Sequence, residues 1–272
     1  DTIVPGAGSQ VLNRYMYTGG NPLRYIDPSG HTYCPPEAGG HCLRDDPVLS
    51  LPIGFEGDWS FKAKEAVLKG YRTVADALFR VFVAERSRHP GTRSNLTDAI
   101  APRNMPTNAR DAFRLVLGQV TFRLAPQCGT TGCSYGVDPG AWAWSRIAGL
   151  GEVWVNEEVT YEGLSAELNT VHELMHGIDQ RGGGAAGNNL KAAWATNNLL
   201  TRGAGGFAGP FLGWQQSRER TGSEVFADMG LGWTYGRWQA DPSAADYGAG
   251  VVKSRYMGVN MPDVLALTVA GN

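Results

Sequence analysis

Val171-His172-Glu173-Leu174-Met175-His176-Gly177-Ile178-Asp179 contains two histidines four residues apart. On a helix this spacing puts both side chains on one face, one turn from each other. Both imidazoles can then reach a single zinc ion at about 2.0–2.1 Å. Glu173 stands beside the first histidine, where a general base acts on metal-activated water. The segment therefore predicts a zinc-dependent hydrolytic centre.

The flanking residues favour a helix that is preceded by a strand. Ser165 is a candidate N-cap, and the glycines that follow Arg181 are expected to end the helix. Residues 152–161 indicate a strand, and its edge would let an extended peptide pair beside the metal helix. The competing interpretation is an ordinary amphipathic helix whose histidines are half-buried.

A third zinc ligand is expected downstream, because a catalytic zinc usually has three protein ligands and one open position. No histidine follows His176, so the acidic residues after Thr221 are the better candidates. Thr221 or Ser223 could cap a helix there, and Glu224 and Asp228 would share one face of it. We expect Glu224 to bind zinc and Asp228 to hold a ligating histidine in the correct tautomer. The alternative for Glu224 is a carboxylate in a Thr-x-x-Glu capping box.

This set of residues resembles the glutamate-liganded zinc peptidases, the gluzincins. The matching residues are His172, Glu173, His176, Glu224 and Asp228. Thermolysin-like members share the Glu-x-x-x-Asp spacing, and lethal-factor-like members share His-Glu-x-x-His-x-x-Asp, which extends the match to Asp179. The resemblance implies a zincin-like fold, Zn2+ as the cofactor and endopeptidase activity. Asp179 is then a candidate outer partner of the metal site, although a solvated acid near the helix end is an equal alternative.

The bulk composition is typical of a protein that folds around a buried core. The chain has 272 residues, of which 42% are hydrophobic and 18% charged, so it can bury a core. The net charge is −2 and no basic run stands out, so nucleic acid is not an expected partner. No apolar stretch reaches the roughly 20 residues that a membrane-spanning helix needs.

The cysteines fall into two close pairs, Cys34 with Cys42 and Cys128 with Cys133. Local disulfides suit both spacings and are the favoured interpretation. A structural zinc built from the four, with His41 nearby, remains open.

The first thirty residues carry a different signature. Asn13-Arg14-Tyr15-Met16-Tyr17, Asn21-Pro22-Leu23 and Tyr25-Ile26-Asp27-Pro28-Ser29-Gly30 alternate aromatics with tight turns, which predicts short strands. This stretch is similar to the end of the RHS/YD-repeat core. In that family a β-repeat shell encloses a variable C-terminal toxin, and paired aspartates near the junction often cleave the shell from it.

The RHS resemblance has several implications for the chain. Asp1 and Asp27 would be the paired acids, although Asp27 is also explained as a turn residue before proline. The residues after His31 would be the variable effector, secreted and delivered to a target cell as part of a larger toxin. An RHS shell and an immunity protein would be its partners, together with a protein or peptide substrate.

The expected fold class is α+β: a zincin-like metallopeptidase domain with a small β-rich RHS-core tail. We divide the chain into the tail at 1–31, a Cys/Pro/Gly linker at 32–57 and the metallopeptidase domain at 58–272. Within that domain, helices are predicted at 59–85 and 108–118 and a strand at 119–124. The glycine-rich stretch 181–222 is either a lid over the cleft, with a helical island at 188–200, or a plain connecting loop.

Three hypotheses for function follow from the sequence. The leading one is a zinc-dependent endopeptidase toxin in which Glu173 is the base. The second is a non-catalytic plug or carrier segment of an RHS shell, with a metal that serves only stability. The third is a zinc hydrolase that acts on a non-peptide amide.

Overall fold

The computed structural model describes residues 51–88, 94–125, 143–147, 151–156, 160–209 and 221–270. The RHS-like tail, the four cysteines and most of the linker lie outside these ranges, as do residues 210–220 of the glycine-rich stretch 181–222. The expectations for those residues remain predictions.

A small mixed sheet forms one layer of the fold. Its strands are β1 (Ile53–Glu56), β2 (Val120–Ala125), β3 (Ala143–Arg146) and β4 (Glu152–Asn156). They lie in the order β1-β2-β4-β3, with β1, β2 and β4 parallel and β3 antiparallel to β4. The strand predicted at 152–161 is therefore β4, which ends at Asn156 and has a neighbour on both sides. The expectation that its edge is open to a peptide is wrong, because β2 and β3 occupy both of its edges.

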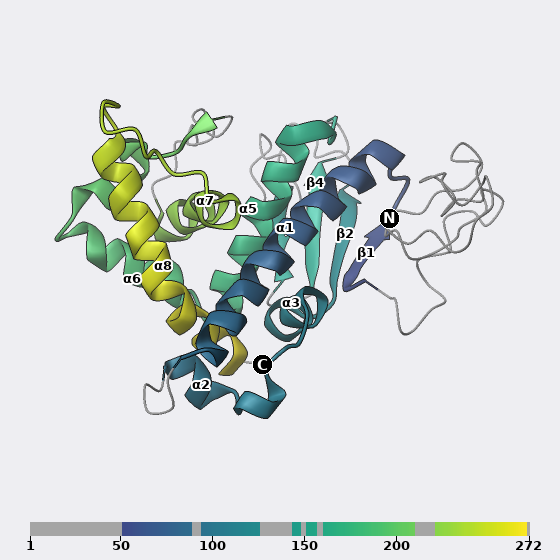
Figure 1. Ribbon diagram of the computed structural model, residues 1–272. Coiled ribbons are helices and arrows are strands. Elements are labelled where there is room, and N and C mark those ends of the chain that lie inside the picture. The colour runs from purple at the N-terminus through teal and green to yellow at the C-terminus, as the bar shows by residue number, and fades with distance from the viewer. Residues whose placement is uncertain are drawn as a thin grey trace, which may run out of the picture. The chain divides into compact units, whose positions relative to one another are not determined.

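Two long helices, α1 (Phe61–Arg86) and α5 (Gly163–Arg181), lie against one face of this sheet (Figure 1). Val153 and Val155 of β4 point into this layer and are fully buried, whereas their neighbours along the strand are partly exposed. Period-two alternation of this kind is expected for a sheet with one covered face. Ser60 caps α1 by accepting a hydrogen bond from the Ala63 N–H at 3.1 Å.

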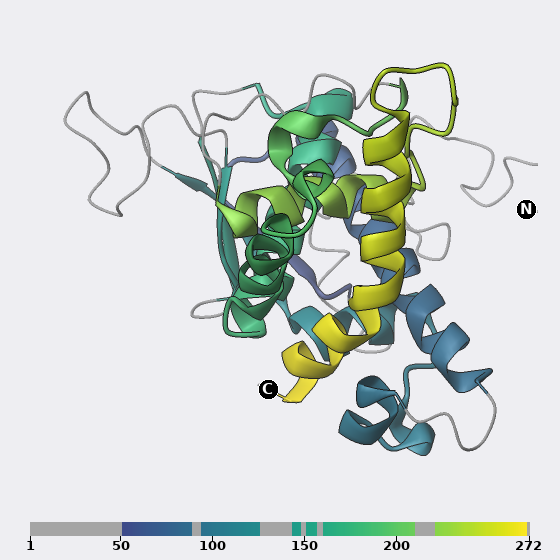
Figure 2. The same ribbon diagram turned by 90° about the vertical axis from the view of Figure 1, so that its left-hand side faces the viewer.

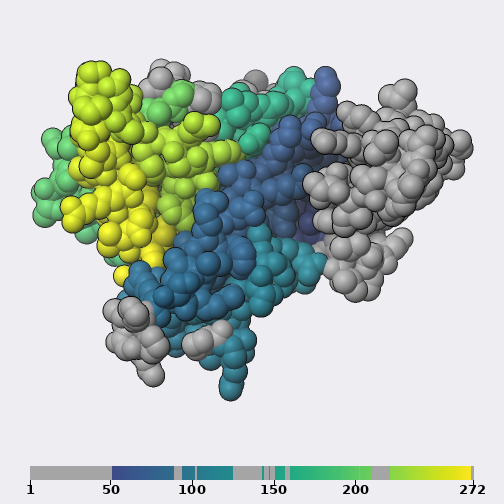
Figure 3. Space-filling model, in the orientation of Figure 1, coloured from purple at the N-terminus to yellow at the C-terminus, as the bar shows by residue number. Residues whose placement is uncertain are grey.

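The remaining helices of the described ranges come both before and after strands β2, β3 and β4 in the sequence. They are α2 (Asn95–Ala99), α3 (Ala109–Leu117), α6 (Ala185–Trp194), α7 (Gly222–Tyr235) and α8 (Tyr247–Ala270), with short 3-10 turns at Pro102–Asn104, Asn198–Leu200 and Arg202–Ala204. Helix α7 packs on α5, α6 and α8 (Figures 1 and 2). On the face shown in Figure 3, α1 and α8 both lie at the surface. The combination of helices with a separate small sheet confirms the α+β class.

Two boundaries differ from the sequence-based expectation. A compact unit begins at Pro52, so strand β1 lies inside the stretch 32–57 that was predicted as a linker. The helical island predicted at 188–200 is present as α6, but it starts earlier, at Ala185, and ends earlier, at Trp194. None of the helices in the described ranges is long and apolar enough to cross a bilayer.

Candidate metal centre

Helix α5 is buried along most of its length. Every residue from Thr170 to Asp179 is buried, which is typical of a helix in the interior of a protein. This burial shields the side chains of His172, Glu173 and His176 from water. Polar groups in such a place must be hydrogen-bonded or bind an ion, so their partners decide what the site can do.

The ends of α5 agree only partly with the prediction. The helix ends at Arg181 with Gly182 as its C-cap, as expected. It begins at Gly163, however, so Ser165 lies inside the first turn and is not the cap. The chain enters the helix through Gly163 at a φ of +65°, a conformation that glycine adopts readily, and this sets the start before Ser165. Glu162 precedes the helix, and its carboxylate accepts a hydrogen bond from the Ser60 hydroxyl at 3.2 Å.

Helix α7 brings the second part of the site. Thr221 is its N-cap, and the Thr221 hydroxyl accepts a hydrogen bond from the Glu224 N–H at 3.2 Å. The backbone half of the predicted capping box is therefore present. The Glu224 carboxylate lies against the two histidines of α5, so the capping interaction and the proposed ligand role coexist.

The three candidate ligands form a close triangle. His172 Nε2 lies 3.1 Å from His176 Nε2. Glu224 Oε2 lies 3.3 Å from His172 Nε2, and Glu224 Oε1 lies 3.2 Å from His176 Nε2. The structure thus brings together, from two helices, the three side chains that the sequence singled out, and this group could hold a metal ion.

The triangle fits a small divalent cation in both spacing and donor type. Ligand atoms about 2.0–2.1 Å from a tetrahedral zinc ion lie about 3.3 Å apart, close to the observed separations. Two imidazole nitrogens and one carboxylate oxygen are also a donor set found in catalytic zinc sites, where the fourth position stays open. His172, His176 and Glu224 are the residues that would hold the ion.

Each histidine has a partner on its other ring nitrogen. His172 Nδ1 lies 3.1 Å from Asp228 Oδ1, and Asp228 is only 1% exposed. His176 Nδ1 lies 3.1 Å from the Ser223 hydroxyl oxygen. Such partners orient a ligating imidazole and select the tautomer whose Nε2 lone pair faces the metal. Asp228 has the predicted location, whereas the role of Ser223 was missed, although its place directly before Glu224 was a usable signal.

The carboxylates set the charge state of the metal-free site. Burial disfavours a charged His172, but hydrogen bonds to Asp228 and Glu224 outweigh it and raise the pKa of His172 to about 10. Burial likewise disfavours a charged Glu224, yet the hydrogen bonds with His172 and His176 hold the pKa of its carboxyl well below the usual range. The site therefore concentrates negative charge around the imidazoles, which favours a bound cation.

Glu173 is 4% exposed and lies next to the first ligand in the chain. Burial lowers the pKa of His172, whereas Asp228 and Glu224 raise it, and the negative charge of Glu173 adds a smaller increase. It also adds to the effect of burial in raising the pKa of Tyr161, whose hydroxyl oxygen lies 3.0 Å from that of Thr170 on α5. The Glu173 carboxylate thus acts electrostatically on the first ligand.

Asp179 does not act on the histidines as an outer partner. It is 3% exposed, so it is not a solvated acid either. Its Oδ1 accepts a hydrogen bond from the Gly187 N–H of α6 at 2.9 Å, and no hydrogen bond joins it to His172 or His176 within the part of the chain that is described. The sequence pattern placed it on the correct face of α5, but its partner comes from another helix.

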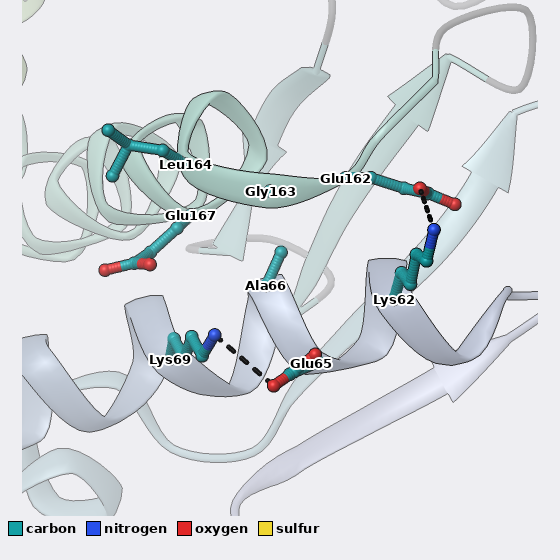
Figure 4. A pocket seen from close by; sticks show the side chains of 8 residues that line it. All are labelled: Lys62, Glu65, Ala66, Lys69, Glu162, Gly163, Leu164 and Glu167. Atoms are coloured by element: carbon teal, nitrogen blue, oxygen red, sulfur yellow. Dashed lines mark ion pairs between the residues drawn. The ribbon is translucent and has the colours of Figure 1, made fainter.

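A separate groove of about 580 Å³ opens between the first turns of α1 and α5 (Figure 4). Its charged lining residues are Lys62, Glu65, Lys69, Glu162 and Glu167. Ion pairs join Lys62 to Glu162 at 3.8 Å and Lys69 to Glu65 at 3.3 Å. None of the candidate ligands lines this groove, and its charges are of both signs.

Comparison with known proteins does not assign this chain to a family. No protein-family model, curated protein or solved structure matches the chain.

Proposed function

We propose that this chain is a zinc-dependent endopeptidase of the gluzincin type with a zincin-like fold. The observation that carries the proposal is the triangle of His172, His176 and Glu224, buried on two packed helices with Glu173 beside the first ligand. An ordinary amphipathic helix would not require a carboxylate from a second helix within 3.3 Å of one imidazole and 3.2 Å of the other.

A zinc ion held there would lower the pKa of a coordinated water to about 7 and polarise the carbonyl of the scissile bond. Asp228 and Ser223 hold the two imidazoles so that both Nε2 atoms face Glu224. Glu173 supplies the proton-transfer group: its carboxylate takes a proton from the attacking water and gives it to the leaving amine.

The sheet offers a place for an extended substrate. Among the described strands, β3 is the outer one on the α5 side, and it runs antiparallel to β4. Ile147, directly after β3, packs on Gly177 of the metal helix. A peptide that pairs with the outer edge of β3 would extend the sheet beside the metal centre. This edge replaces the β4 edge that the sequence suggested.

The biological setting that we propose rests on the sequence of residues 13–30. Their likeness to the end of an RHS core supports a secreted effector, delivered to a target cell by a larger RHS-repeat polypeptide. A toxin peptidase of this kind requires an immunity protein in the cell that makes it. The substrate would be a protein of the target cell.

The test is the variant Glu173→Gln in the full chain. We expect it to bind one zinc per chain like the wild type and to lose hydrolysis of a peptide library by about 10²- to 10⁴-fold, the usual contribution of a general base. Glu167→Gln is the matched control, since it makes the same change on the same helix outside the metal centre, and it should stay active.

Two results would redirect the proposal. Full peptidase activity in Glu173→Gln would remove the assigned base. If the wild type binds zinc but cleaves no peptide and no other amide, the structural plug is favoured. If it binds zinc and cleaves only a non-peptide amide, the alternative hydrolase is favoured.

A further inference from the structure

Helix α6 packs on both helices of the metal centre, and a buried hydrogen bond joins it to α5. Asp179 follows His176 by three residues on α5, so it points from the same face as the ligands. Its Oδ1 accepts the N–H of Gly187, in the first turn of α6, at 2.9 Å. The first N–H groups of a helix have no partner within the helix, and Asp179 supplies one from outside. Asp179 thereby fixes where α6 begins relative to the metal helix.

Gly187 also touches the backbone of α7. A Cβ placed on Gly187 would lie 2.6 Å from Ser223 N, 2.9 Å from Ser223 Cα and 3.0 Å from Asp179 Oδ2. A Cβ placed on Gly222 would collide with the carbonyl oxygen of Gly187. The two backbones are therefore in direct contact, and only glycine fits at either position without moving one helix from the other.

The turn of α7 that Gly187 contacts carries Ser223 and Glu224, which belong to the metal centre. Ser223 Oγ lies 3.1 Å from His176 Nδ1, and the next residue is the candidate ligand Glu224. We propose that Asp179 and Gly187 are positioning residues of the metal centre, which set the distance of Ser223 and Glu224 from His176 through α6. This inference rests on the proposed metal centre and adds to it residues that touch neither the ion nor a ligand.

The size of the effect follows from the contact distances. Ordinary Cβ contacts begin near 3.4 Å, so a methyl group at Gly187 must push Ser223 N away by several tenths of an ångström. Metal–ligand distances tolerate only about 0.2 Å. The displacement thus exceeds what the site can absorb, unless α6 itself shifts and weakens the bond to Asp179.

The experiment measures zinc affinity by competition with a chelator, together with thermal unfolding of the metal-free protein. We expect Gly187→Ala to weaken zinc binding by about 10-fold or more, as loss of an outer partner of a ligand does. With Co2+ in place of zinc, its visible spectrum should also change, because that spectrum reports ligand geometry. Gly258→Ala on α8 is the matched control, since a Cβ there meets no atom within 4 Å and zinc affinity should not change.

Asp179 provides a second test that does not depend on the folding of a glycine variant. Asp179→Ala removes the acceptor of the Gly187 N–H and should weaken zinc binding in the same way. Asp179→Asn keeps an acceptor oxygen and should restore most of the affinity. A purely structural role for these residues predicts lower thermal stability in the alanine variants with unchanged zinc affinity and Co2+ spectrum.

The outcomes separate this inference from the proposed function. Wild-type-like zinc affinity and Co2+ spectra in folded Asp179→Ala would overturn the positioning role while leaving the peptidase proposal intact. Failure of the wild-type chain to bind zinc would overturn both. Reduced affinity in Asp179→Ala and its recovery in Asp179→Asn would support the inference even if no peptide substrate were found.

Discussion

Replacing Asp228 with alanine should weaken zinc binding without removing any ligand. Asp228 Oδ1 lies 3.1 Å from His172 Nδ1, and the residue is 1% exposed. The bond therefore has almost no competition from water. Its loss frees the imidazole to rotate or to adopt the tautomer that turns an N–H toward the metal.

The expected loss of zinc affinity follows from this contact between Asp228 and His172. A hydrogen bond to a charged group contributes about 1.5–3 kcal/mol. At about 1.4 kcal/mol for each factor of ten, that range corresponds to a loss of affinity of about 10- to 100-fold. Measured effects of outer partners on metal affinity span the same range of about 10- to 100-fold. We expect the zinc dissociation constant of Asp228→Ala to rise by that factor.

The assay is competition with a chelator of known affinity at constant pH, on variants that circular dichroism shows to be folded. Asp228→Asn keeps the acceptor oxygen and should lose less than the alanine variant. Asp263→Ala is the control, because that aspartate lies at the surface of α8 and bonds only Asn95 among the described side chains. A dissociation constant for Asp228→Ala within about threefold of the wild-type value would refute this reasoning, since loss of the partner on a ligating imidazole is expected to cost about tenfold or more.

Three further predictions concern the ligand helix and the metal-free site. Glu224→Gln should weaken zinc binding by more than the roughly 10- to 100-fold expected for an outer partner, and metal analysis by dialysis would detect this. The metal-free protein should become less stable as pH rises from about 6.5 to about 10, because the raised pKa of His172 stabilises the folded state only while the imidazole is protonated. Thermal unfolding in chelator at several pH values measures this trend, and the His172→Gln variant should lack it. Gly230→Ala should lower the free energy of unfolding by about 1–3 kcal/mol, because a Cβ there collides with Met175; urea titration checks it, and no change would contradict the close packing of α5 on α7.

The local parts of the metal centre could be predicted because they depend on helix geometry alone. Residues four apart on a helix share a face whatever surrounds them, which places His172 with His176 and Glu224 with Asp228. The stop at Gly182 and the cap at Thr221 are likewise local. Ser165 failed as a cap because the backbone at Gly163 starts the helix earlier.

The pairing of strands in the sheet could not be predicted from local patterns. The sequence indicated a strand at residues 152–161, and the structure has β4 there, with alternating buried and partly exposed residues. Its neighbours come from distant parts of the chain, with β2 parallel on one side and β3 antiparallel on the other. An alternating pattern shows which face of a strand is buried but carries no information on which edge is paired.

The sequence alone determined which residues have the chemistry to bind a metal, since side-chain type and helical spacing are local properties. Only the tertiary structure decided that Glu224 meets both histidines, that Ser223 contacts His176 across 47 residues of chain, and that Asp179 bonds to α6 instead of to a ligand. The physical reason is that these contacts depend on how closely whole helices approach. The direct contact of α6 with α7 at Gly187 and Gly222, where a Cβ on either residue would collide with the other helix, is one such approach, and no periodic pattern in the sequence encodes it.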